Sequence, residues 1–254
     1  MRIDLNCDVG EAFGNYSLAD DGETIGCVTS VNVACGFHAG DPSVMEKTVK
    51  LASEHGAAVG AHPGFMDLQG FGRRRMDMSV EEIEAFVLYQ VAALAGFVRA
   101  AGEQLAHVKP HGALYNMAAN DRAISDAIVR AIARFDPGLI LVGLAGSLLV
   151  EAGLDAGLRV AREAFADRAY SADGTLRSRC LPGAVLDSPE KVTRQAVELV
   201  CQRSVVAYEG DVLQIDSDTL CIHGDTPGAA SIARAVRRGL LEADVELVPM
   251  RAFV

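Results

Sequence analysis

The sequence predicts an α/β fold in which parallel strands close, or nearly close, into a barrel. Short apolar stretches alternate with helical segments along the chain, as in βαβ units. Several of these stretches end in turns that carry His, Lys, Asp or Asn, which is typical of the catalytic strand ends of α/β barrels. No composition break or linker divides the chain, so we expect residues 1–254 to form one domain.

Apolar runs of strand length recur between helical segments. We expect strands at residues 2–7, 28–35, 57–61, 105–109, 138–143, 157–162 and 219–223, with a weaker one at 244–248. Seven or eight such units favour a barrel over its main rival, an open doubly wound sheet. That rival predicts a Gly-rich turn after the first strand, and Cys7-Asp8-Val9-Gly10-Glu11 does not match GxGxxG. The sequence also has no GxxxxGK[ST] phosphate loop.

Capping residues mark where the helices between these strands begin and end. Asp41-Pro42 predicts the start of a helix that stops before Gly56. Ser79-Val80-Glu81-Glu82 is a capping box, and its helix should run to Gly102.

Three further helices follow from the same signals. One should start near Asn120, because residues 124, 128, 131 and 132 place apolar side chains on one helical face. Ser188-Pro189 and Thr226-Pro227 each predict a helix start.

Composition limits the classes of function. The 254 residues carry a net charge of −11, which argues against a general nucleic-acid surface but leaves room for a small anion in a local basic pocket. Met1 leads straight into a strand, so no leader is expected, and no uninterrupted apolar run reaches the ~18 residues of a membrane span. We therefore expect a cytoplasmic enzyme. The apolar helix faces fit either a core or a second copy of the chain, which leaves a homo-oligomer open.

The six cysteines form no CxxC pair and match no zinc-ribbon spacing. Cys7, Cys35 and Cys221 lie on expected strands, and we interpret them as small buried residues of a reducing compartment. Alternation along the first strand places Asn6 and Asp8 on one face and Cys7 on the other. We expect Cys7, Cys35 and Cys221 to face away from the site.

Polar side chains at the strand ends are the candidates for chemistry. Four of the six histidines lie there. We expect the catalytic set to be Asp8, Lys109, His111 and His223. We expect the substrate- or anion-binding set to be Asn6, His38, His62, Arg73, Arg74, Glu163, Arg168 and Asp225.

Lysine and arginine at such ends point to an anionic ligand. A lysine directed into a barrel is costly unless it meets an anion or a carboxylate, and a structural ion pair of Lys109 with Asp8 or Glu163 is the competing interpretation. The glycines around Arg73 and Arg74 permit close approach of the backbone, and arginines can bind a carboxylate or phosphate through two hydrogen bonds.

The strand-end histidines fit either of two chemistries. Neutral imidazole combined with carboxylate is a usual ligand set for zinc and similar ions, and scattered ligands are normal in barrels. Imidazole also acts as acid, base or hydrogen-bond donor to an oxyanion. Spacing alone does not decide between them. We assign the histidines to acid–base and binding roles and name no metal ligand, so a bound metal stays open.

Longer blocks give a specific resemblance, which extends in order over nearly the whole chain. The blocks are Asp4-Leu5-Asn6-Cys7-Asp8 with Gly10-Glu11, residues 32–41, Gly60-Ala61-His62-Pro63, Phe71-Gly72-Arg73-Arg74, residues 108–116, Phe165-Ala166-Asp167-Arg168 and residues 223–228. They resemble the signature of the LamB/YcsF family, the A component of bacterial ATP-dependent 5-oxoprolinase. One departure is visible: Arg177-Ser178-Arg179 stands where Val-Pro-Arg would be expected, which puts the conformation of that loop in question.

The resemblance implies a distorted seven-stranded, TIM-like (β/α) barrel similar to the glycoside hydrolase and polysaccharide deacetylase barrel. It implies hydrolysis of the lactam 5-oxo-L-proline to L-glutamate, with ATP as co-substrate and subunits B and C as partners. This chain would be the ring-opening component, and the ATP site could lie on this chain or on a partner. Two alternatives are a metal-dependent carbohydrate deacetylase and a non-catalytic binding subunit of the complex.

Overall fold

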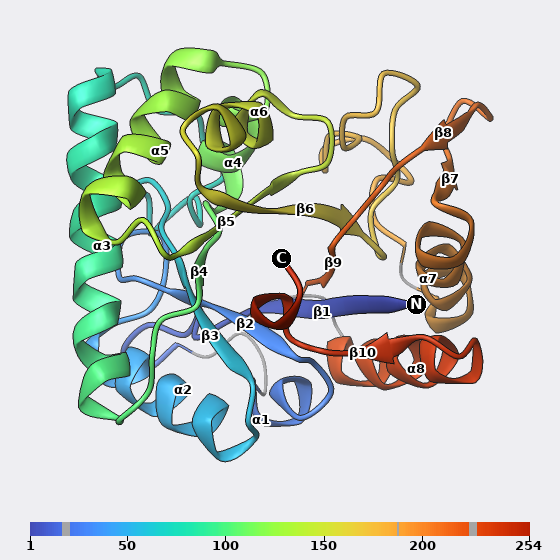
Figure 1. Ribbon diagram of the computed structural model, residues 1–254, viewed down its shortest axis with the longest axis horizontal. Coiled ribbons are helices and arrows are strands. Elements are labelled where there is room, and N and C mark those ends of the chain that lie inside the picture. The colour runs from blue at the N-terminus through green and yellow to red at the C-terminus, as the bar shows by residue number, and fades with distance from the viewer. Residues whose placement is uncertain (17–20, 187, 224–227) are drawn as a thin grey trace.

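A computed structural model describes residues 1–16, 21–186, 188–223 and 228–254. Within these residues, seven parallel strands close into a barrel in the order β1-β2-β3-β4-β5-β6-β9, and β9 pairs back with β1. The strands are β1 (Arg2–Val9), β2 (Ser30–Ala34), β3 (Ala58–His62), β4 (His107–Val108), β5 (Ile140–Leu144), β6 (Arg159–Phe165) and β9 (Thr219–Ile222). Figure 1 shows β1 between β2 and β9. The predicted closed barrel is confirmed.

Helices cover the outside of the barrel. They are α1 (Asp21–Ile25), α2 (Pro42–Glu54), α3 (Val80–Ala100), α4 (Gly112–Ala118), α5 (Arg122–Phe135), α6 (Leu148–Asp155), α7 (Pro189–Val197) and α8 (Ala229–Glu242). In Figure 1, α3 runs beside α5 on one flank of the barrel, and α7 runs beside α8 on the other. A π-helical turn, Glu198–Gln202, extends α7, and a 3-10 turn, Met250–Ala252, ends near the C-terminus.

The structure confirms two of the helix starts that the capping residues predict. The Asp41 carboxylate accepts hydrogen bonds from the backbone N–H groups of Ser43 and Val44, and Ser79 and Glu82 form the expected capping box. The helix expected near Asn120 begins two residues later, with Asp121 as its cap. α7 begins at Pro189 as expected. Thr226-Pro227 lies outside the described residues.

By length and composition alone, α3 is apolar enough to cross a membrane; it is the one such helix among the residues described. Its apolar stripe of Ile83, Val87, Val91, Leu94 and Val98 is buried in the same core as the barrel strands. That pattern is typical of a helix on the outside of a barrel, which buries one apolar face against the strands and exposes the opposite face.

Two small features were missed by the strand prediction. β7 (Ser204–Val206) and β8 (Val212–Gln214) form an antiparallel hairpin outside the barrel. Gly210, at φ +102°, provides the turn between them. The weaker strand candidate is β10 (Glu246–Leu247), which pairs with the start of β1 and adds no barrel strand.

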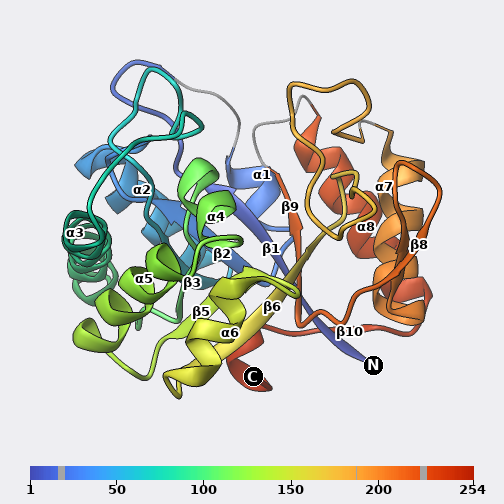
Figure 2. The ribbon, with the colours of Figure 1, turned by 90° about the horizontal axis from the view of Figure 1, so that it is seen from above.

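The loops that follow the strands lie together at one end of the barrel. Figure 2 shows the loops after β3 and β6 rising on the same side, with both chain termini on the opposite side. The C-terminal ends of the parallel strands therefore open toward one face, where α/β barrels carry their active sites.

Candidate active site

The floor of the barrel interior is a closed network around Asp4. Its carboxylate accepts hydrogen bonds from the hydroxyls of Thr29 (2.8 Å), Ser30 (2.5 Å) and Thr219 (2.5 Å) and from the backbone N–H of Met250 (3.2 Å). Asp4 is completely buried, and burial raises its pKa although these hydrogen bonds oppose the shift. Asp4 is the deepest acidic group on β1, and this network gives it a structural role.

A layer of amides lies one step higher. Asn32 Nδ2 donates to Asn6 Oδ1 (2.7 Å) and to Asp8 Oδ1 (2.9 Å), while its Oδ1 lies 2.7 Å from His107 Nε2. Gly60 makes room for that imidazole, since a Cβ at this position would lie 2.1 Å from His107 Nε2. Burial and the nearby Lys109 lower the pKa of His107 to about 3.

Lys109 joins the next layer into one ion cluster. Its ammonium lies 2.8 Å from Glu163 Oε1 and 3.1 Å from Asp8 Oδ1, and it donates to Asn6 Oδ1 at 3.3 Å. Glu163 also accepts hydrogen bonds from Asn6 Nδ2 (3.1 Å) and from the Tyr115 hydroxyl (2.7 Å). The ion pair considered for Lys109 therefore exists with both carboxylates.

Charge, more than burial, governs this cluster. Burial by itself would lower the pKa of Lys109, but Asp8 and other neighbours hold it well above its usual 10.5. Burial would raise the pKa of Asp8, yet the Lys109 ammonium and the neighbouring His62 hold it well below 3.8. The ammonium and the Asp8 carboxylate are both ionised at neutral pH.

One orientation predicted from the sequence is wrong. Cys221 points into the barrel, because its Sγ lies 3.1 Å from Lys109 Nζ. On β9 and the residue that follows it, the inward positions are Thr219, Cys221 and His223, and alternation by two residues explains this set. Cys221 therefore shares the inward face with His223, and the register of the strand fixes both directions. Burial raises the pKa of Cys221 well above 9, so the thiol is neutral.

His223 is held by an aspartate that follows β6. Its Nδ1 lies 2.9 Å from both carboxylate oxygens of Asp167, and its backbone N–H donates to Oδ2 at 3.0 Å. Burial would raise the pKa of Asp167, but His223 and the hydrogen bonds it donates lower it. A carboxylate that accepts from Nδ1 fixes the ring so that Nε2 is the available nitrogen.

Three more histidines meet beside Asp8. The rings of His38 and His111 stack at 3.7 Å, and His62 lies edge-on to both. Burial and neighbouring imidazoles lower the pKa values of His38 and His111 well below 6.5. Glu11, in the turn after β1, places Oε1 3.7 Å from His38 Nε2 and 3.8 Å from His111 Nδ1.

The ligand atoms of these four side chains lie within 4.8 Å of one another, so they could hold a metal ion.

A cavity of about 620 Å³ opens above the ion cluster. Among the described residues, its polar lining includes Asp8, His62, Arg73, Lys109, Tyr115, His111, Arg168, Asp173, Arg179 and His223. Burial and Arg179 lower the pKa of Arg168 to about 10, which still leaves its guanidinium charged at neutral pH. The cations at this cavity suit an anionic ligand, as the sequence suggested.

The other described residues of the binding set lie outside this lining. Asn6 and Glu163 sit beneath it and hold Lys109, and His38 sits behind His111. Arg74 is turned to Asp67, with which it forms an ion pair. Asp225 lies outside the described residues.

Several pocket residues were not in the predicted set. Arg179 and Tyr115 line the cavity, Asp167 orients His223 and Glu11 faces the histidines. Glu11 and Asp167 each lie within a few residues of a named strand end, and this proximity was the available signal. At the departure from the family pattern, Arg177 turns away onto the ring of Tyr208, 3.6 Å from its centroid, while Arg179 reaches the cavity.

Known proteins resemble this chain closely in sequence and in fold. The A component of 5-oxoprolinase from Tolumonas auensis is 55% identical over 98% of this chain and 99% of its own length. The protein of the same name from Bacillus subtilis is 52% identical, over 97% and 96% respectively. The crystal structure of the lactam utilization protein from Thermus thermophilus matches with a TM-score of 0.93 and 49% identity, covering 98% of this chain and 99% of that one.

A more distant likeness is to a T48 deacetylase structure, with a TM-score of 0.51, 16% identity and coverage of 98% of this chain and 88% of that one. This likeness concerns the barrel alone. The model of the LamB/YcsF family matches residues 3–254, and the chain belongs to that family.

Proposed function

We propose that this chain opens the lactam ring of 5-oxo-L-proline, giving L-glutamate, as the A component of an ATP-dependent 5-oxoprolinase. The observation that carries the proposal is that one cavity is lined by the Asp8–Lys109 ion pair, by His223 with its partner Asp167 behind it, and by three arginines. The names of the close relatives support the same activity and an assembly of several subunits. Subunits B and C would be the partners.

The chemistry explains why ATP would be needed. A lactam carbonyl is a weak electrophile, because the ring nitrogen donates electron density to it. Transfer of the γ-phosphoryl group of ATP to the amide oxygen would make the carbonyl carbon more electrophilic and release ADP. Water would then add to that carbon and the C–N bond would break, which leaves an acyl phosphate. A second water would hydrolyse the acyl phosphate to L-glutamate and inorganic phosphate.

The cavity residues fit the parts of this reaction. Arg73, Arg168 and Arg179 can bind the carboxylate of the substrate and the phosphoryl oxygens. His223, oriented by Asp167, would take a proton from water and return it to the ring nitrogen. Lys109 would stabilise negative charge that develops at the oxygen, and Asp8 keeps that ammonium charged and in place.

The sequence lacks the two common nucleotide-binding motifs, so we place the ATP site on a partner protein. Titration of the isolated chain with a non-hydrolysable ATP analogue tests this placement. No binding by the isolated chain is expected, and binding that His223→Gln weakens would move the ATP site into this cavity.

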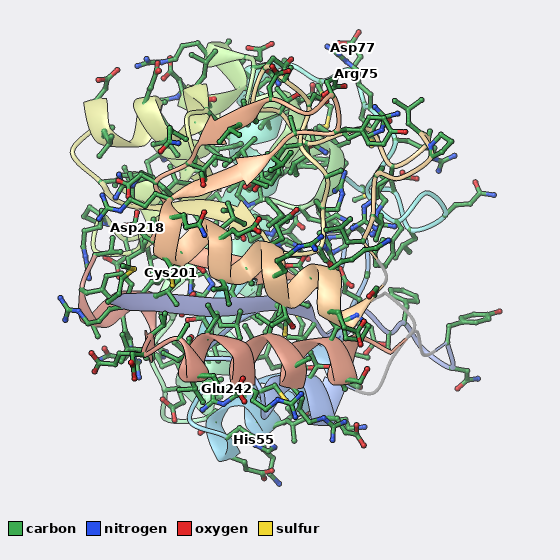
Figure 3. The ribbon with its side chains drawn as sticks, turned by 90° about the vertical axis from the view of Figure 1, so that its right-hand side faces the viewer. His55, Arg75, Asp77, Cys201, Asp218 and Glu242 are labelled. Atoms are coloured by element: carbon green, nitrogen blue, oxygen red, sulfur yellow. The ribbon has the colours of Figure 1, made fainter. Side chains whose placement is uncertain are left out.

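The decisive test is a reconstituted assay with the partner subunits, 5-oxoproline and ATP, in which glutamate is measured. His223→Gln should lower the rate by ~10²–10⁴-fold, the usual contribution of a general base. His55→Gln is the matched control, because His55 is exposed and lies at the outer edge of the molecule in Figure 3. Full glutamate production by both His223→Gln and Asp8→Asn would instead make this chain a non-catalytic binding subunit.

A further inference from the structure

Two imidazoles beside the cavity face each other through nitrogens that both lack a proton when neutral. His62 Nδ1 lies 2.7 Å from the carbonyl oxygen of Lys109, and His111 Nε2 lies 2.8 Å from that of Phe71. A carbonyl oxygen can only accept, so these two ring nitrogens carry the hydrogens. His62 Nε2 and His111 Nδ1 are then both lone-pair atoms, and they lie only 2.9 Å apart.

Two lone pairs at this distance repel unless a cation lies between or beside them. The cation is either a proton shared by the two rings or a metal ion bound to both. The remaining neighbours decide between these occupants, because a proton needs only two acceptors and a metal ion needs more.

His38 supplies a third ligand. It is 1% exposed, and neither of its ring nitrogens has a hydrogen-bond partner within the described part of the chain. An imidazole buried without partners loses the free energy of its hydration. Its ring is stacked on His111, which directs Nε2 toward the same point.

Glu11 supplies a carboxylate as the fourth ligand. Its Oε1 lies 3.7 Å from His38 Nε2 and 3.8 Å from His111 Nδ1. Zinc–nitrogen bonds of ~2.0–2.1 Å in a tetrahedron place ligand atoms about 3.3–3.4 Å apart. The separations of 2.9, 3.7 and 3.8 Å bracket that value.

We propose that Glu11, His38, His62 and His111 form a binding site for a divalent transition-metal ion, with zinc the best match to three imidazoles and one carboxylate. The hydrogen bonds from His62 and His111 to backbone carbonyls are the outer contacts that orient histidine ligands in metal sites. Phe71 has φ +55°, a conformation that aromatic residues rarely adopt, and its carbonyl receives one of those bonds.

The backbone around the cluster is shaped to admit the three rings. A Cβ on Gly72 would lie 2.7 Å from His38 Cβ and 2.8 Å from His111 Cδ2, and a Cβ on Gly64 would lie 2.7 Å from His38 Nδ1. His62 and His111 also line the 620 Å³ cavity, so an ion there would be reachable from the side that Asp8 faces. It would supply a Lewis acid at that wall.

A second group of ligand-type atoms, Asp8, Cys221 and His223, is the weaker candidate. The Lys109 ammonium already lies 3.1 Å from both Asp8 Oδ1 and Cys221 Sγ, and a second cation there would be repelled. This group serves as the alternative in the test.

The test uses the purified full-length chain, stripped with a chelator and titrated with zinc chloride in a calorimeter. We expect one zinc per chain and a rise in melting temperature on binding. His38→Ala should weaken binding by more than ~100-fold, beyond the ~10–100-fold that loss of an outer contact costs. Glu11→Gln, which preserves shape, should weaken binding while circular dichroism shows the native fold. His55→Ala should bind as the unchanged chain does.

Cobalt in place of zinc locates the ion. A thiolate-to-cobalt charge-transfer band would place the metal on Cys221 and overturn the proposal, as would zinc binding unaffected by both His38→Ala and Glu11→Gln. Uptake of less than ~0.1 zinc per chain by the unchanged protein would mean that the two imidazoles share a proton alone, and this too would overturn it. If His38→Ala fails to fold, His38→Gln and Glu11→Gln carry the same comparison. The site does not depend on the proposed lactam chemistry, because its readout is binding.

Discussion

Asp4 and Asp8 lie on the same strand and the same face, and both are buried, yet their pKa values shift in opposite directions. Asp4 is surrounded by hydroxyls and a backbone N–H, and its burial dominates. Asp8 is beside the Lys109 ammonium and His62, and these neighbours outweigh burial. Four residues of one strand therefore separate the hydrogen-bonded floor around Asp4 from the charged rim, the ion cluster of Asp8, Lys109 and Glu163. The neighbours of each aspartate, rather than its burial, set the direction of its pKa shift.

Removing the cation should have the largest effect. Lys109→Met leaves Asp8 and Glu163 as buried carboxylates without their shared counter-charge, which costs about 3–5 kcal/mol in the free energy of unfolding. Glutamate formation in the reconstituted assay should fall by more than ~10³-fold if the ammonium also stabilises the transition state. Chemical denaturation and the assay measure the two losses.

Lys47→Met on the exposed face of α2 is the matched control and should change stability by no more than ~0.5 kcal/mol. A Lys109→Met protein with native stability and turnover would show that the rim cluster contributes to neither.

The two aspartates should also differ in how stability depends on pH. The folded pKa of Asp4 is raised, so the folded state holds its proton longer, and the ionised group costs stability as pH rises above 3.8. The free energy of unfolding of Asp4→Asn, relative to that of the unchanged protein, should therefore increase from about pH 4 to about pH 7. Denaturation curves across this range measure the gap.

For Asp8 the sign is reversed. Its folded pKa lies well below 3.8, so its contribution is complete above that value and is lost only as pH falls below it. The gap to Asp8→Asn should stay level between about pH 5 and 8. Equal slopes for the two variants would remove the distinction between floor and rim.

The arginine loop should affect substrate binding more than turnover. Arg73 lines the cavity beside the ion cluster, and Arg73→Ala should raise KM by about tenfold, equal to ~1.4 kcal/mol, with a smaller change in kcat. Arg75→Ala is the control, since Arg75 is exposed and points outward in Figure 3. An equal rise in KM for both would mean that the loop acts through its general charge.

The reactivity of the thiols should distinguish buried cysteines from exposed ones, and it is the smallest of the expected effects. Cys180 and Cys201 are exposed, whereas Cys7, Cys27, Cys35 and Cys221 are buried. Burial raises the pKa values of these four, that of Cys35 to about 12, so they remain protonated at neutral pH. A thiol reagent should modify two cysteines quickly in the native chain and six after unfolding. Rapid reaction of Cys221 would show that the cavity exposes the inner face of β9.

Local signals in the sequence predict the barrel and most of the polar residues at its strand ends. Alternating strands and helices, caps at Asp41 and Ser79, and polar residues at strand ends are local signals, because periodicity and capping depend on near neighbours. Those signals placed Asp8, Lys109, His111 and His223 at one end of the fold, as Figures 1 and 2 show for their strands.

How those side chains are paired depends on contacts between segments that are far apart in the chain. The inward direction of Cys221 follows from the register of β9 against β1, which residues more than 200 positions apart create. Glu11 meets His38 and His111 through contacts between different loops, and Arg74 is withdrawn to Asp67 within the loop that follows β3. A strand pattern states which residues share a face, but the closure of the barrel fixes which face is inside and which charges meet there.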